Sequence, residues 1–139
     1  MNNKEIEYAQ YLIGSNNKLV CGIDTALKAL RPYARYDMSA SGGHFEFTRW
    51  EDETGTNPPT KEEIFKELEY QNAFCEYWQH FVDRASNYPD ITILVNQLFE
   101  AMDKDQIPGK GTDFYNSIKE VNDKFPRPTG DRPVRPTYE

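Results

Sequence analysis

The chain has 139 residues, a length that suits one domain of average size. Its net charge of −7 disfavours general nucleic-acid binding, because such proteins use a basic surface to neutralise phosphates. Only 37% of the residues are hydrophobic, yet 14% are aromatic. Few aliphatic and many aromatic residues indicate a small core together with contact surfaces built on rings, which are enriched at protein interfaces.

No apolar run approaches the roughly 20 residues that span a bilayer, so we expect no membrane segment and no membrane partner. The only two cysteines, Cys21 and Cys75, do not form a Cys-x-x-Cys pair, and no secretory signal is visible. Because Cys75 falls within a helical pattern, we expect it to pack as a small apolar residue and to remain a free thiol.

Residues 1–20 are predicted to be an N-terminal arm that carries a short helix. Ile6, Ala9 and Leu12 recur at helical spacing within a helix from Asn2 to Ile13. Helices at a chain terminus are often mobile unless a partner holds them, and the sequence leaves open whether this one packs on its own domain or on a neighbour.

A second helix and a β-hairpin follow. Asp24 is a good N-cap residue for a helix that runs to Leu30, and Pro32 ends it. The hairpin, residues 33–50, is predicted because outward and inward side chains alternate on both of its strands. Glycines in the connecting residues 39–43 suit a tight turn.

A long helix over residues 60–86 is predicted next. Thr60 and Glu63 form a capping box, in which each side chain bonds the backbone amide of the other residue. One stripe of the helix carries apolar residues, and further rings lie beside it: Ile64, Leu68, Cys75, Trp78 and Val82, then Phe65, Phe74 and Phe81. At 1.5 Å per residue the helix is about 39 Å long, more than a small domain can cover. Part of its aromatic face is therefore expected to meet another protein.

The C-terminal third predicts a pair of short helices over residues 90–125, capped by Asp90 and Thr112 and ended by Pro126. The tail, residues 127–139, alternates prolines with charges and is expected to be extended. The predicted fold is α+β and mainly helical, with a single globular domain over residues 21–126.

Candidate chemistry is sparse. The two histidines, His44 and His80, lack the three or four ligands that a metal site needs. Cys75 and His80 are five residues apart, and this is not the spacing that places two helical ligands on one face. No nucleophile is paired with a base. We therefore expect no catalytic, cofactor-binding or metal-binding residues and interpret the chain as a non-enzyme.

Two stretches resemble small bacteriophage proteins. The first is a module of phages that infect marine and other bacteria, carried here by Tyr88, Pro89, Leu98, Phe99, Phe114, Tyr115, Ile118, Val121, Lys124, Phe125, Pro126 and Pro128. This chain has Thr92-Ile93-Leu94 where the module usually has polar residues, which indicates a more buried helix. The second resembles the phage domain called XkdW-like, through Ala26-Leu27-Lys28-Ala29-Leu30-Arg31-Pro32, Trp50 and Pro59-Thr60-Lys61-Glu62-Glu63-Ile64.

Together the two stretches cover more than half of the chain. The resemblance implies a structural or accessory subunit of a virion, at the tail, the neck or the fibre attachment, made in the host cytoplasm. Its partners would be other virion proteins in a symmetric, multi-copy assembly. The alternative is a tail or tail-fibre assembly chaperone that is absent from the mature particle.

The residues that we expect to contact partners lie on the long helix and in the tail. On the helix they belong to the aromatic face that is longer than a small domain can cover, and in the tail the arginines are spaced by prolines that keep the chain extended. These candidates are Phe74, Tyr77, Trp78, Phe81, Arg132, Arg135 and Tyr138.

Overall fold

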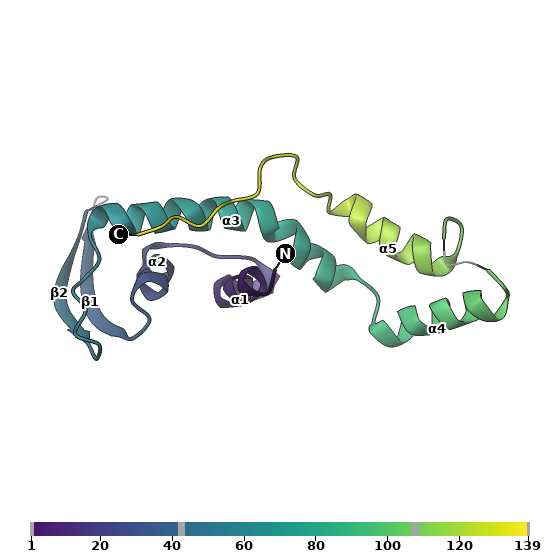
Figure 1. The fold of residues 1–139 in the computed structure, drawn as a ribbon, viewed down its shortest axis with the longest axis horizontal. Helices are drawn as coiled ribbons and strands as arrows, with labels where there is room; N and C mark the ends of the chain where they lie inside the picture. The colour runs from purple at the N-terminus through teal and green to yellow at the C-terminus, as the bar shows by residue number, and fades with distance from the viewer. Residues whose placement is uncertain (1, 42–43, 107–108, 139) are drawn as a thin grey trace. The chain divides into compact units, whose positions relative to one another are not determined.

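The structure is a computed structural model that describes residues 2–41, 44–106 and 109–138. Over these residues it contains five α-helices, one short 3-10 helix and a two-stranded antiparallel hairpin, which confirms a mainly helical α+β fold (Figure 1). The main elements are α1 (Asn3–Leu12), α2 (Ile23–Leu30), β1 (Ala34–Ser41), β2 (His44–Asp52), α3 (Lys61–Asn87), α4 (Ile91–Asp103) and α5 (Asp113–Lys124). The expected glycine turn at Gly42 and Gly43 lies outside the described residues.

Two compact units make up the chain, and their boundary falls inside α3. Unit 1 holds the residues up to Leu19 together with Tyr77–Asp131, and unit 2 holds Val20–Glu76 together with the C-terminal tail from Arg132 onward. The expected arrangement was different, with a single domain over residues 21–126 between an arm and a tail. In the structure the N-terminal helix and residues 127–131 belong to unit 1, and the tail from Arg132 onward belongs to unit 2.

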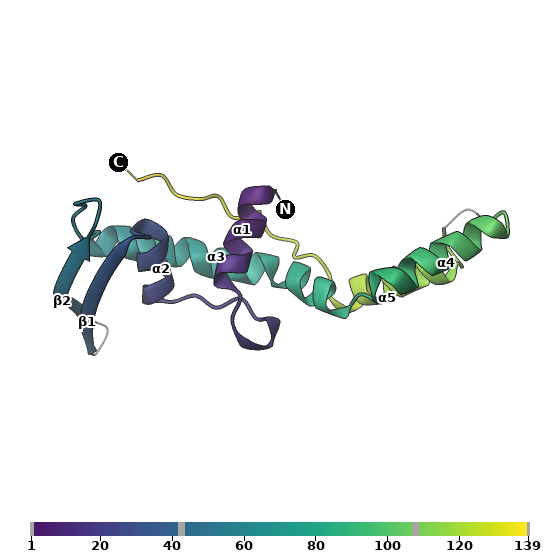
Figure 2. The same cartoon turned by 90° about the horizontal axis from the view of Figure 1, so that it is seen from below.

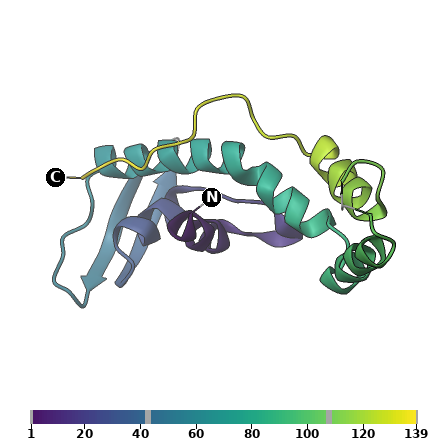
Figure 3. The ribbon, with the colours of Figure 1, turned by 45° about the vertical axis from the view of Figure 1, so that its right-hand side comes forward.

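The core of unit 2 forms where α2, the hairpin and the N-terminal half of α3 meet (Figure 3). Ala26, Leu27, Phe45 and Ile64 are its buried residues. Partly buried side chains surround them: Ile23, Leu30, Tyr36, Met38, Phe47, Trp50 and Leu68. The core is thus rich in rings, as the composition predicts.

A β-bulge keeps the aromatic residues of β2 on one side of the hairpin. Tyr36 pairs with Trp50, and after a register shift Met38 pairs with Phe47, so Thr48 is the extra residue. Phe47 and Trp50 are three positions apart and would face opposite sides of a regular strand. The extra residue shifts the alternation by one position, so both side chains face the same side of the hairpin. The ring centroids of Phe47 and Trp50 are 5.1 Å apart.

The start of α2 differs from the prediction. Gly22, not Asp24, occupies the N-cap position, and the Thr25 hydroxyl accepts a hydrogen bond of 2.8 Å from the Gly22 N–H. Asp24 lies in the first turn of the helix, where a carboxylate also interacts favourably with the helix dipole. Its Oδ1 accepts a hydrogen bond of 3.3 Å from the Tyr36 hydroxyl.

In unit 1 the segment after α1 is fastened to α3. The Gln79 side chain accepts a hydrogen bond of 2.9 Å from the Leu19 N–H and donates one of 3.1 Å to the Asn17 carbonyl. Lys18 forms an ion pair with Asp83 at 3.2 Å. Contacts within the chain therefore hold the segment that follows the N-terminal helix.

Helices α4 and α5 lie side by side and antiparallel (Figure 2). Both predicted caps are confirmed, since Asp90 accepts a hydrogen bond from the Thr92 N–H and Thr112 accepts one from the Tyr115 N–H. Arg84 of α3 donates a hydrogen bond of 2.7 Å to the carbonyl of Phe125, at the end of α5. This bond joins the helix pair to the last turns of α3.

Candidate functional site

Two polar residues lie on the buried stripe of α3 in unit 2. Ile64, Glu67, Gln71 and Phe74 follow one another at spacings of three and four residues, and each is 0% exposed. This spacing marks the face of a helix that packs against a core, where apolar side chains are usual. A buried carboxylate is costly unless hydrogen bonds or an opposite charge compensate it. Glu67 is therefore the residue that needs an explanation.

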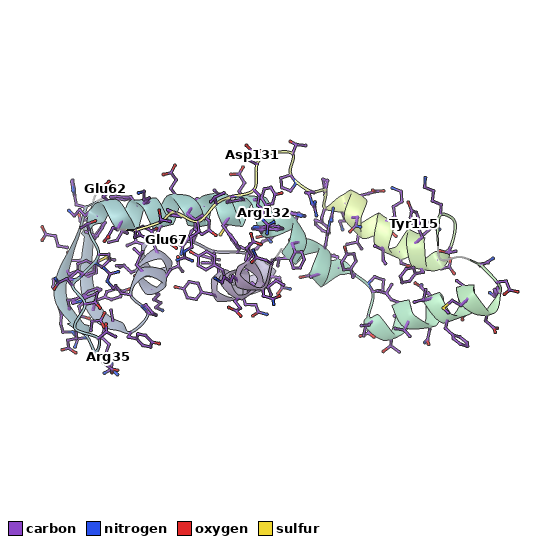
Figure 4. The ribbon with its side chains drawn as sticks, in the orientation of Figure 1. Arg35, Glu62, Glu67, Tyr115, Asp131 and Arg132 are labelled. Carbon is purple, nitrogen blue, oxygen red and sulfur yellow. The ribbon has the colours of Figure 1, made fainter. Side chains whose placement is uncertain are left out.

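The C-terminal tail supplies the partners of Glu67. Arg135 Nη2 lies 3.1 Å from Glu67 Oε1, and the Tyr138 hydroxyl donates a hydrogen bond to Glu67 Oε2. Each carboxylate oxygen thus receives a donor from the tail, which runs alongside α3 at the position of Glu67 (Figure 4). Glu67, Arg135 and Tyr138 together are called the tail clamp below.

The tail clamp combines charge with aromatic contacts. The Arg135 guanidinium lies 5.8 Å from the centroid of the Tyr70 ring, at a distance that suits a cation–π interaction. Burial, followed by the hydrogen bond to Glu67, raises the pKa of Tyr138 well above its usual value. Tyr138 therefore stays a neutral phenol, and its hydroxyl donates a hydrogen bond to the carboxylate.

The tail itself has no helix or strand over the described residues 125–138, as expected for a proline-spaced segment. Arg132 is exposed and lies where the tail reaches unit 2 (Figure 4). Beside Tyr138 the tail and the start of α3 form an open polar pocket of about 500 Å³. Its lining residues are Thr60, Glu62, Glu63, Lys66, Thr137 and Tyr138.

A second set of polar contacts joins α3 to α2 and to the segment before it. Gln71 Oε1 accepts a hydrogen bond of 2.8 Å from the Thr25 hydroxyl. One helical position further on, Asn72 Oδ1 lies 2.7 Å from Cys21 Sγ. Cys21 and Cys75 are both free thiols. Burial, and then the neighbouring Cys21, raises the pKa of Cys75 to about 12, so its thiol stays protonated.

The aromatic residues that we expected to contact partners differ in exposure. Phe74 is 0% exposed and Trp78 is 4% exposed, so both rings are packed within the chain. Tyr77 is half-buried, with its ring centroid 4.8 Å from that of Trp78. Phe81 is 41% exposed. Of these four rings, Tyr77 and Phe81 alone keep surface for a partner.

Phe81 borders an apolar groove of unit 1. The groove lies between α1 and the last turns of α3 and has a volume of about 290 Å³. Apolar side chains from both helices line it, among them Ile6, Ala9, Ile13, Phe81 and Val82. The exposed ring therefore belongs to a defined surface rather than to an isolated position.

The sequence analysis missed Glu67 because the predicted stripe includes apolar residues alone. Steps of three and four residues from Ile64 lead to Glu67, Gln71 and Phe74, so the pattern that defines the buried face includes both polar residues. A charged residue at such a position is itself a signal that a partner lies nearby. The identity of the partner, 68 residues further along the chain, depends on the tertiary structure.

Within the described residues, no group of three or more His, Cys, Asp or Glu side chains could hold a metal ion. No helix in this part of the chain is long and apolar enough to cross a membrane. Comparison with family models, with curated proteins and with solved structures finds no match to the chain. The fold and the tail clamp thus define a small, mainly helical α+β protein whose C-terminal tail is bound to a buried carboxylate.

Proposed function

We propose that this chain is a non-enzymatic structural or accessory subunit of a bacteriophage particle, in the tail, the neck or the fibre-attachment region, and acts through protein–protein contacts. The observation that carries the proposal is that each stretch with phage-like residues coincides with a structural module. Residues 26–64 supply the core cluster of unit 2, and residues 88–128 contain the α4–α5 pair.

The individual residues of the resemblance have structural roles that suit a module. Ala26, Leu27 and Ile64 are 0% exposed in the core of unit 2. Tyr88 donates a hydrogen bond of 2.5 Å to Asn122, which connects the start of the helix pair to its end. Such residues preserve a scaffold that presents surfaces to partners, as a subunit of an assembly requires.

Mass spectrometry of gradient-purified particles tests the proposal. A virion subunit would be present in the particles at a copy number set by the symmetry of the tail, whereas its absence from them would refute the assignment. The alternative, a tail or tail-fibre assembly chaperone, rests on the same resemblance. It predicts that the chain co-purifies with its client protein from infected cells and is lost from mature particles.

A further inference from the structure

Helix α4 is apolar over a wider arc than α5 covers. Gln97 accepts a hydrogen bond of 3.2 Å from Ser117 of α5, which marks the side of α4 that faces its neighbour. Leu94 and Ala101 lie three positions before and four positions after Gln97, on that same side, and Ala101 is 5% exposed. Packing against α5 therefore covers this side of α4 alone.

A second apolar side of α4 faces solvent in the chain. Ile91 is 74% exposed, Val95 55%, Phe99 66% and Met102 62%. At about 100° per residue these four side chains fall within an arc of roughly 80°, so they form one continuous stripe. We call Ile91, Val95, Phe99 and Met102 the α4 stripe. The expectation that the start of this helix is buried is therefore wrong for the isolated chain.

The chemistry of the stripe restricts what can cover it. The sole charged residue between Ile91 and Met102 is Glu100, which projects from the other side of the helix. Helix α4 has no lysine or arginine, so it lacks the basic face with which amphipathic helices bind anionic lipid surfaces. Continuous exposed apolar patches of this kind mark contacts with proteins. The occupant must offer an uncharged apolar stripe of similar length.

We propose that the occupant is the α4 stripe of a second copy of this chain. A two-fold interface uses the same patch on both subunits, so an uncharged apolar stripe is its own complement. Two α4–α5 pairs joined in this way form a four-helix bundle whose interior the stripes fill.

The area agrees with a stable dimer. The eight stripe side chains of two copies bury on the order of 700 Å² of apolar surface, at the amounts usual for Val, Ile, Phe and Met. The smallest specific interfaces bury roughly 1,200 Å² in total, of which roughly 60% is apolar. The stripe thus supplies the apolar part of such an interface without help from unit 2. This inference names a partner for the proposed subunit but does not rest on its location in a particle.

Analytical ultracentrifugation of the full chain over a wide concentration range tests the proposal. We expect the wild-type protein to be in a monomer–dimer equilibrium. Phe99→Glu should raise the dimer dissociation constant about tenfold or more, because a charge replaces a central apolar contact. The matched control is Ile93→Glu, which changes a residue of α4 that is 51% exposed but lies outside the stripe. It should leave the dissociation constant within about twofold of the wild-type value, since substitutions outside the contact are near neutral.

Circular dichroism spectra must first show that both variants keep the helix content of the wild-type protein. A wild-type chain that stays monomeric at every concentration would overturn the proposal. So would equal effects of the two substitutions on the dissociation constant. None of these outcomes depends on whether the chain is found in particles, so failure here is distinguishable from failure of the proposed function.

Discussion

Arg135 Nη2 lies 3.1 Å from the Oε1 atom of Glu67, although 68 residues separate the two in the chain. Glu67 is fully buried on α3, and the side chain of Arg135 is 47% exposed. The pair therefore spans the boundary between the interior of unit 2 and the solvent. Through this contact the tail from Arg132 onward is part of unit 2.

Arg135→Ala should destabilise the protein by about 1–2 kcal/mol, because it removes a charged donor from a buried carboxylate while solvent already screens part of that interaction. Urea unfolding, followed by circular dichroism, measures the change. The control is Val134→Ala, at a neighbouring tail residue that is 86% exposed. If both variants unfold at the same urea concentration, the tail clamp does not stabilise unit 2.

Tyr138→Phe should lower the unfolding free energy at neutral pH by about 1–2 kcal/mol, because it deletes a hydrogen bond to a charged group. The folded protein raises the pKa of Tyr138 above the usual 10.0, so this stabilisation is complete below that pH. It is lost as the pH rises and the unfolded chain ionises its tyrosine first. The difference between wild type and variant should therefore shrink between pH 9 and pH 11. A difference that stays constant over this range would contradict the assignment.

Stability should also fall in mild acid because of His80. Its imidazole is 8% exposed, and Nδ1 donates a hydrogen bond of 2.7 Å to the Tyr77 carbonyl. Burial, aided by the charges of Arg84 and Arg127, lowers the pKa of His80 below its usual 6.5. The folded protein then binds a proton less readily than the unfolded chain does. The stabilisation is present above pH 6.5 and declines as the pH falls below that value.

Unfolding free energies at pH 7.5 and pH 5.5 test this dependence. Replacing the imidazole in His80→Asn should remove part of the loss at pH 5.5, since the amide can donate to the same carbonyl but does not titrate. His44→Asn, at the exposed first residue of β2, is the matched control and should keep the full loss. A similar pH dependence in both variants would show that His80 is not its source.

Cys75 should react slowly with alkylating reagents in the native protein. A pKa of about 12 in place of the usual 9.0 lowers the thiolate fraction at pH 8 on the order of a thousandfold, and the thiolate is the nucleophile. Peptide mapping by mass spectrometry after timed exposure to iodoacetamide measures the rate at Cys75 separately from that at Cys21. The same protein in urea provides the reference. Equal rates in the folded and unfolded states would contradict the burial of this thiol.

Local sequence signals predicted the helices and their caps well. Thr60 and Glu63 bond each other's backbone amides at 2.9 and 3.2 Å, as a capping box requires, and α3 then runs from Lys61 to Asn87. Interactions of this kind join residues three or four positions apart, so their geometry is already encoded in the local sequence. The single error among the caps, Gly22 in place of Asp24, arose where a side chain from the hairpin engages the expected cap residue.

The sequence did not predict which side chains of β2 face the core, nor which of the aromatic residues are buried. The bulge at Thr48 depends on how two strands pair, and it brings Trp50 to the core side. The burial of Phe74 and Trp78 depends on which face of α3 the other elements cover. Neither property belongs to a single segment.

By itself, the sequence determined the order of the helices and strands and most of the helix caps, because caps, prolines and side-chain periodicity act over a few residues. Only the tertiary structure decided that the tail from Arg132 onward belongs to unit 2, because the contacts of Arg135 and Tyr138 with Glu67 join residues far apart in the chain. Local propensity does not report such long-range contacts, since they form only when the intervening chain has folded.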